Sequence, residues 1–140
     1  MTHSGAADDA MRESATILLV EDEELVRKVV ASWLEAAGYQ TLAASDGPEA
    51  LGICEQYEGP IHLLATDVVM PGMTGTALAR QASRLKPGME VLYLSGYGDT
   101  AGPYQDAVQP GAHFLGKPFE MEDLVSKVRE ILGKPKPGQG

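Results

Sequence analysis

Hydrophobic and polar residues alternate in blocks along this chain of 140 residues. Short, continuous apolar runs suit buried strands, and between them apolar residues recur every three or four positions, the spacing of an amphipathic helix. The predicted strands occupy residues 16–20, 40–44, 61–66, 91–94 and 112–116, and the predicted helices occupy 25–37, 46–57, 75–85 and 124–132. Strands that alternate with helices form parallel sheets covered on both faces. The pattern therefore predicts a five-stranded, doubly wound α/β domain over residues 16–132.

Three segments fall outside this alternation. Residues 1–15 are small, polar and aperiodic, and we expect a disordered leader there. Residues 133–140 are rich in Gly, Pro and Lys and are expected to form a flexible tail. Between the last two strands, Gly102 and Pro103 interrupt any helix that begins at Thr100. The helix in this region is predicted to be short and the segment to be mobile.

The charge balance narrows the range of partners. Twenty Asp and Glu residues against eleven Lys and Arg give a formal net charge of −9. Such a charge repels phosphate backbones and anionic membranes, so direct binding to nucleic acid or to a membrane is not expected. No apolar run approaches the roughly 18 residues that cross a bilayer, and the first residues lack a signal-peptide pattern. We expect a soluble cytoplasmic protein whose single cysteine, Cys54, is a buried, inert thiol.

Polar residues with distinctive chemistry stand where four predicted strands end. Glu21 and Asp22 follow the first strand, Asp67 the third, Ser95 the fourth and Lys117 the fifth. Because parallel strands of an open sheet present their carboxyl ends at one edge, we expect these five side chains to converge there.

The residue types in this set favour a metal and a phosphoryl group. Three carboxylates repel one another unless a hard divalent cation neutralises them, and the absence of His and Cys from these strand ends disfavours zinc and favours Mg²⁺. An ammonium and a hydroxyl facing that cation complete a site for phosphoryl oxygens. Each residue also has a simpler interpretation. Asp67 and Ser95 are ordinary turn residues, Glu21 and Asp22 suit a helix amino terminus, and Lys117 suits a surface.

Four motifs in this order resemble those of the receiver domains of two-component response regulators. They are Val20-Glu21-Asp22-Glu23, the run from Thr66 to Gly75 that contains Asp67, Leu94-Ser95-Gly96-Tyr97, and Lys117-Pro118-Phe119. The resemblance spans about residues 16–132 and is greatest to receivers associated with hybrid histidine kinases. It implies a flavodoxin-like fold with strand order 2-1-3-4-5.

The resemblance also implies roles for the strand-end residues. Asp67 would accept a phosphoryl group from a histidine kinase or a histidine phosphotransfer protein. Glu21, Asp22, Asp67 and the backbone carbonyl of Val69 would surround Mg²⁺, and Lys117 would bind the phosphoryl oxygens. The domain would therefore be a signalling phosphoprotein and not an enzyme with a separate substrate. Because the Val69 side chain cannot hold a water by a hydrogen bond, we expect the domain to dephosphorylate itself slowly.

Signalling would depend on a second set of residues. By the same resemblance Ser95 is the switch hydroxyl and Phe114 the switch aromatic, although Ser and Phe stand where the family more often has Thr and Tyr. The signal would be read by a protein partner on the face formed by the segment near residue 100, the last strand and the last helix. Val69 and Tyr97 lie two residues beyond Asp67 and Ser95, where they would flank the path of the hydrolytic water and set how long the phosphoryl group persists.

Two other functions are consistent with parts of this pattern. A Mg²⁺-dependent aspartyl-phosphate hydrolase of the haloacid dehalogenase type also uses a strand-end Asp, but it needs a second Asp two residues later, where this chain has Val69. A receiver-like interaction module that is never phosphorylated would be favoured by loss of an acidic residue or of Lys117, and all of these are present. No DNA-binding output domain is expected after residue 132, which leaves a stand-alone regulator, a phosphate sink or a fragment of a hybrid kinase.

Overall fold

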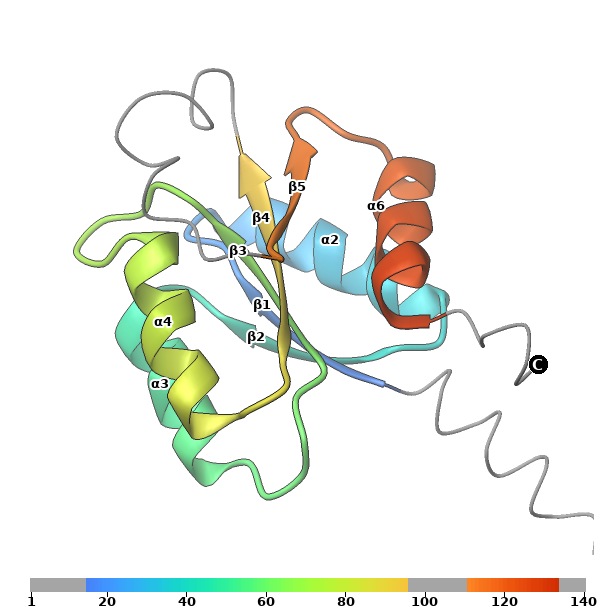
Figure 1. Cartoon of the computed structure of the whole chain (residues 1–140). Coiled ribbons are helices and arrows are strands. Elements are labelled where there is room, and N and C mark those ends of the chain that lie inside the picture. The colour runs from blue at the N-terminus through green and yellow to red at the C-terminus, as the bar shows by residue number, and fades with distance from the viewer. Residues whose placement is uncertain (1–14, 96–110, 134–140) are drawn as a thin grey trace, which may run out of the picture.

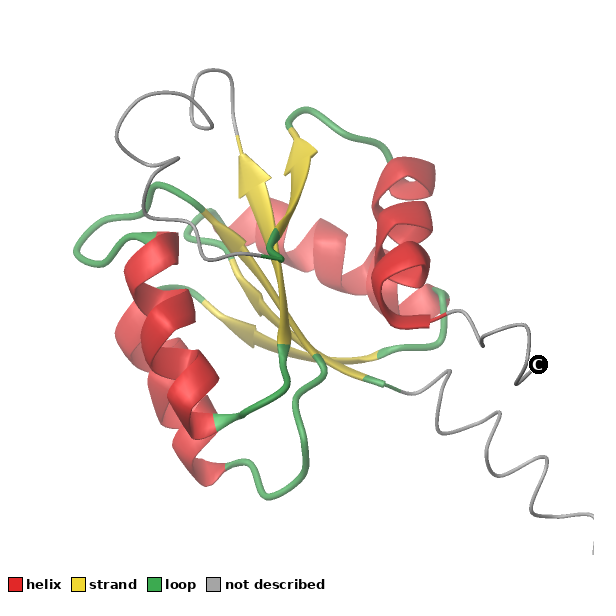
Figure 2. Ribbon diagram, viewed as in Figure 1, coloured by secondary structure: helices red, strands yellow, loops and turns green. Residues whose placement is uncertain are grey.

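The computed structural model describes residues 15–95 and 111–133. Its five strands form one parallel sheet in the order β2-β1-β3-β4-β5, drawn in yellow in Figure 2. The strands are β1 (Thr16–Val20), β2 (Gln40–Ala44), β3 (Leu63–Asp67), β4 (Glu90–Ser95) and β5 (His113–Gly116). The predicted doubly wound sheet and its strand order are confirmed.

Helices cover both faces of the sheet (Figure 1). They are α2 (Glu24–Ala36), α3 (Gly47–Gln56), α4 (Gly75–Leu85) and α6 (Met121–Val128), the last continued by a π-helical turn, η1 (Arg129–Gly133). Helices α2 and α6 pack on one face, and α3 and α4 on the other. No helix of the described residues is long and apolar enough to cross a membrane.

The pleat of β1, a strand in the interior of the sheet, divides the core into two layers. Side chains alternate along a strand, so Leu18 and Val20 of β1 pack in the layer under α3 and α4, whereas Ile17 and Leu19 pack in the layer under α2 and α6. All four side chains are fully buried. This double burial explains why every position of β1 after Thr16 is apolar.

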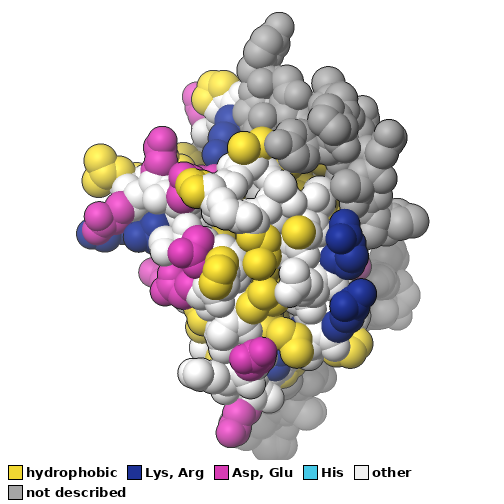
Figure 3. All heavy atoms as spheres, turned by 90° about the vertical axis from the view of Figure 1, so that its left-hand side faces the viewer, with side chains coloured by type: hydrophobic (Ala, Val, Ile, Leu, Met, Phe, Trp, Pro, Cys, Tyr) yellow, Lys and Arg dark blue, Asp and Glu magenta, His cyan; other side chains and the backbone are white. Residues whose placement is uncertain are grey.

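The outer surface of the α3 and α4 layer is split by charge. In Figure 3, hydrophobic side chains form a band between acidic side chains on one side and basic side chains on the other. Exposed Glu49 and Glu55 belong to α3, and exposed Arg80 and Arg84 belong to α4. This charged surface lies across the sheet from α2.

Several predicted boundaries shift by one or two residues. The third strand begins at Leu63 and not at residue 61. The backbone of His62, just before it, still bonds to Thr16 and Glu90. Strand β4 is longer than predicted, and Ser95 belongs to it. Ala15, assigned to the leader, is buried and its carbonyl accepts from the amide of Gln40. The predicted short helix after Thr100 lies outside the described residues.

The turn after β3 brings two backbone segments into close approach. The amide of Gly75 donates to the carbonyl oxygen of Val68 at 2.8 Å, and Thr74 caps α4 by accepting from the amide of Ala77 at 3.1 Å. A Cβ atom at Gly75 would collide with the carbonyl oxygen of Asp67, which is backbone and cannot move aside cheaply. Only glycine therefore lets α4 begin this close to Asp67.

We predict that Gly75→Ala lowers the free energy of unfolding by about 2 kcal/mol, because overpacking against fixed backbone forces the turn to shift. Gly52→Ala is the matched control. Gly52 lies inside α3 with nothing within 4 Å of an added Cβ, and alanine there should stabilise by roughly 0.5–1 kcal/mol. Urea unfolding of both variants checks the prediction, and equal effects would show that the close approach does not matter.

Candidate functional site

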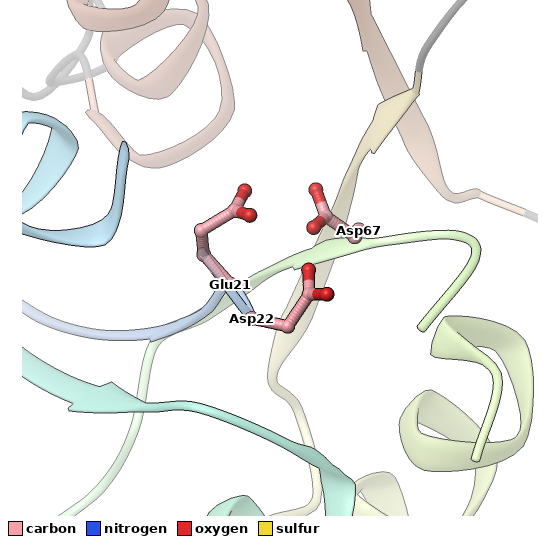
Figure 4. A group of neighbouring side chains, drawn as sticks. All are labelled: Glu21, Asp22 and Asp67. Carbon is pink, nitrogen blue, oxygen red and sulfur yellow. The ribbon is translucent and has the colours of Figure 1, made fainter. Parts of the chain in front are cut away.

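Three carboxylates meet at the carboxyl ends of β1 and β3. Figure 4 shows Glu21, Asp22 and Asp67 turned toward one another, and each offers an oxygen within 4.8 Å of the others. Glu21 and Asp67 are buried, whereas Asp22 is exposed. The predicted convergence arises because β1 and β3 are neighbours, with Val20 paired to Thr66.

Lys117 brings a positive charge to this group from the loop after β5. Its Nζ donates to Oδ1 of Asp67 at 2.6 Å and to Oε1 of Glu21 at 3.3 Å. Its amide donates to the carbonyl oxygen of Ser95 at 2.7 Å, which ties the loop to the end of β4. The peptide bond from Lys117 to Pro118 is cis.

Burial has the largest effect on the carboxyl group of Asp67. It raises the pKa of Asp67 to about 7 against the lowering effect of the Lys117 ammonium. Burial alone would lower the pKa of Lys117, but the hydrogen bonds and charges of Asp67 and Glu21 outweigh it and raise that pKa. The desolvated carboxylate of Asp67 is thus costly to ionise unless more positive charge is nearby.

The donor set fits a hard divalent cation. All three groups that the structure brings together are carboxylates, and no His or Cys joins them in the part of the chain that the structure describes. Oxygen donors of this kind suit Mg²⁺, which keeps several waters and needs few protein ligands. Val69, whose carbonyl is the fourth predicted ligand, lines the same groove as the three carboxylates.

The two predicted switch residues lie on the neighbouring strands. Ser95 is buried at the end of β4 and is paired with Gly116, one residue before Lys117. The Phe114 ring lies against the ring of Tyr93, with centroids 5.4 Å apart and planes tilted by 33°. Tyr93 is fully buried, which raises its pKa to about 12. Tyr97, predicted to affect timing, lies outside the described residues.

An apolar groove runs from the carboxylates along α2. Leu25, Val29 and Trp33 line one side, and Val69 and Phe119 also contribute to its wall. Leu25 is 77% exposed and Val29 45% exposed. Phe119 meets Trp33 edge to face, with ring centroids 6.4 Å apart, so α2 also supports the loop that carries Lys117. The groove therefore presents exposed apolar side chains directly beside the three carboxylates.

The sequence pattern did not predict this groove, and it did not identify the contact made by the Arg27 side chain. The apolar spacing that predicts a helix over residues 25–37 does not distinguish the exposed Leu25 and Val29 from the buried Val30 and Leu34. The apolar arc of this helix is wider than one core contact requires, and that width was the available signal.

The side chain of Arg27 was not identified as part of the site by the sequence. Its Nη1 donates to the carbonyl oxygen of Glu21 at 2.8 Å. No local motif distinguishes it from a surface arginine.

Comparison with known proteins agrees with this geometry. Residues 17–129 match the response regulator receiver domain family. The chain is 37% identical to the response regulator receiver protein CpdR of Brucella abortus over 83% of this chain and 95% of CpdR. It is 38% identical to the sensor kinase CckA of the same organism, but over 86% of this chain and only 13% of CckA.

Solved structures of receiver domains are also similar to this chain. The receiver domain of the hybrid histidine kinase CckA superposes with a TM-score of 0.73 at 38% identity, covering 85% of this chain and all of that domain. A receiver protein from Sinorhizobium medicae gives a TM-score of 0.75 at 30% identity, over 86% of this chain and 95% of that protein.

The fold and the strand-edge carboxylates define an α/β signalling domain. The chain belongs to the response regulator receiver domain family of two-component systems. Membership implies interaction with histidine kinases or phosphotransfer proteins and, in general, an acidic pocket for Mg²⁺.

We predict that Mg²⁺ raises the melting temperature at neutral pH, because the ion binds the native carboxylate group and not the unfolded chain. At about one hundred times its dissociation constant the gain is roughly 5–10 °C. Asp22→Ala should remove most of it. Glu23→Ala, which deletes the adjacent exposed carboxylate outside the three-residue group, should keep it. Thermal scans with and without Mg²⁺ decide, and equal gains in both variants would locate the ion elsewhere.

Proposed function

We propose that this chain accepts a phosphoryl group on Asp67 from a phosphohistidine donor and passes the signal on by protein contacts. The observation that carries the proposal is the pairing of a buried strand-end carboxylate with Lys117 Nζ at 2.6 Å, inside a group of three carboxylates. Sequence and fold membership in the receiver family support it.

The residues suit the transfer step. An oxygen of the Asp67 carboxylate attacks phosphorus, the bond from phosphorus to the donor nitrogen breaks, and its electron pair returns to the imidazole, which takes up a proton. This transfer depends on alignment and charge neutralisation more than on a strong nucleophile. Lys117 neutralises charge on the transferred oxygens from one side. Glu21, Asp22, Asp67 and the Val69 carbonyl would hold Mg²⁺, which when bound supplies the remaining positive charge.

Acetyl phosphate with Mg²⁺ should raise the intact mass of the protein by one phosphoryl group. Asp67→Asn should show no gain, because the amide cannot form the acyl phosphate. Asp123→Asn, a change of the same kind at an exposed position in α6, should gain it fully. Intact-mass spectrometry provides the readout. A full gain in Asp67→Asn would exclude Asp67 as the acceptor, and no gain in the unmodified protein would exclude the function.

The groove along α2 is proposed as the surface on which the phosphohistidine protein docks. It opens beside Asp67, and its exposed Leu25 and Val29 offer apolar contact area next to the reacting carboxylate. A helix bearing the histidine would lay an apolar face in such a groove. Docking there brings the donor nitrogen to Asp67, whereas a small donor such as acetyl phosphate needs no groove.

Leu25→Asp should slow transfer from a phosphorylated histidine kinase about tenfold or more, since it places a charge in the apolar contact. Its phosphorylation by acetyl phosphate should stay unchanged. Leu85→Asp is the control, because Leu85 is another exposed leucine and lies on α4, across the sheet. Time courses with both donors separate docking from chemistry. If the two variants behave alike with the kinase, the donor docks elsewhere.

The lifetime of the phosphoryl group is proposed to depend on Val69 and Tyr97. The Val69 side chain is 48% exposed and lines the groove beside Asp67, which supports a position on the path of the attacking water. Valine cannot orient that water by a hydrogen bond, so self-dephosphorylation should be slow.

Val69→Asn should release phosphate several-fold faster than the unmodified protein, because its amide can hold the water. Val69→Ala is the control for loss of bulk alone, and it should change the rate less. A phosphate-release time course on both phosphorylated variants tests this. Indistinguishable rates, or a slower Val69→Asn variant, would remove Val69 from the timing of the signal.

We further propose that Ser95 and Phe114 transmit phosphorylation to a partner bound over β5 and α6. Ser95 would shift toward the phosphoryl oxygens, and the Phe114 ring would turn into the space it leaves. The contact between Phe114 and the fully buried Tyr93 supports a switch driven by packing, because Phe114 has no hydroxyl.

A further inference from the structure

The turn between β1 and α2 carries two of the three carboxylates, those of Glu21 and Asp22. The backbone amide and the backbone carbonyl of Glu21 are both held by hydrogen bonds. The amide of Glu21 donates to the carbonyl oxygen of Ala44 at 3.1 Å. The carbonyl of Glu21 lies before the helix begins, where no intrahelical amide reaches it, and it accepts from Nη1 of Arg27 at 2.8 Å. Arg27 thus fixes the peptide plane that joins Glu21 to Asp22.

The two acidic residues depend on this peptide to different degrees. The Glu21 carboxylate has anchors of its own, since it accepts from the amide of Glu23 at 3.1 Å and from Lys117 Nζ at 3.3 Å. The Asp22 carboxylate is exposed, and the structure gives it no hydrogen bond within the described residues. The direction of the Asp22 side chain is therefore set by the backbone that Arg27 holds.

We infer that Arg27 is a positioning residue for the cation site: its hydrogen bond to the Glu21 carbonyl holds Asp22 within reach of Asp67. This inference rests on the proposed metal site. It adds to that site a residue whose side chain bonds to the backbone of Glu21 and not to one of the three carboxylates. Groups behind the ligands commonly set metal affinity, and their loss typically costs roughly tenfold or more.

The charge of Arg27 and its hydrogen bond to Glu21 should have opposite effects on the affinity for a divalent cation, so an experiment can separate them. As a positive charge near a divalent cation, Arg27 weakens binding, so removing it would tighten the site if charge were all that mattered. As the anchor of the turn, it strengthens binding, so removing it should weaken the site. Lys28 provides the matched control. It is the next residue on α2, carries the same charge, and pairs with exposed Glu24 at 3.0 Å.

The experiment measures Mg²⁺ affinity by isothermal titration calorimetry, with melting temperature without Mg²⁺ recorded alongside. Arg27→Ala should bind Mg²⁺ about tenfold more weakly, whereas Lys28→Ala should bind it equally well or slightly more tightly. Arg27→Lys keeps the charge and much of the reach, so its affinity should fall between those of Arg27→Ala and the unmodified protein. It also provides the test if Arg27→Ala does not fold.

The outcomes separate this inference from the proposed function. If the unmodified protein binds no Mg²⁺, the metal site itself is wrong. If it binds Mg²⁺ and folded Arg27→Ala binds it as well as Lys28→Ala does, the site stands and the role of Arg27 is refuted. If Arg27→Lys binds as tightly as the unmodified protein while Arg27→Ala only loses thermal stability, Arg27 is structural and the inference also fails.

Discussion

Crowding of negative charge at one sheet edge is the constraint on which this structure depends. Three carboxylates lie within 4.8 Å of one another, two of them buried, and a single ammonium contacts two of them. Such an arrangement is unfavourable for folding unless other parts of the molecule hold it in place. The parallel pairing of β1 with β3, the glycine turn after Asp67 and the loop after β5 all contribute to holding it. The site is therefore maintained by the stability of the sheet around it.

The sequence predicted the sheet and its polar edge because both follow from the order of apolar runs and polar residues along the chain. Apolar runs such as Thr16–Val20 end directly in charged residues, and in a parallel sheet every such end lies on the same side. Asp67 and Lys117, fifty residues apart, needed no contact information to be assigned to one edge. Strand boundaries were less accurate, since the ends of β3 and β4 depend on which single backbone bonds form.

The features that sequence reasoning missed depend on side-chain reach and on helix rotation. Whether Arg27 turns back to the Glu21 carbonyl or extends into water depends on rotamers, which no residue spacing specifies. Leu25 and Val30 are both apolar and stand in the same helical stripe pattern, yet one is exposed and the other buried. Only the docking of α2 against the sheet and α6 decides which part of its wide apolar arc faces inward.

The two hydrophobic layers on either side of the sheet have a consequence for how such a domain changes during evolution. Substitutions in separate layers share few contacts, so their effects on stability should combine independently. Helix α2 packs only in the layer that contains α6, and the outward stripe formed by its exposed Leu25 and Val29 is not part of either core. Changes on that stripe can therefore accumulate without a compensating change under α3 and α4. A duplicated copy of the gene could therefore change this exposed surface while keeping the three carboxylates at the sheet edge and most of its core.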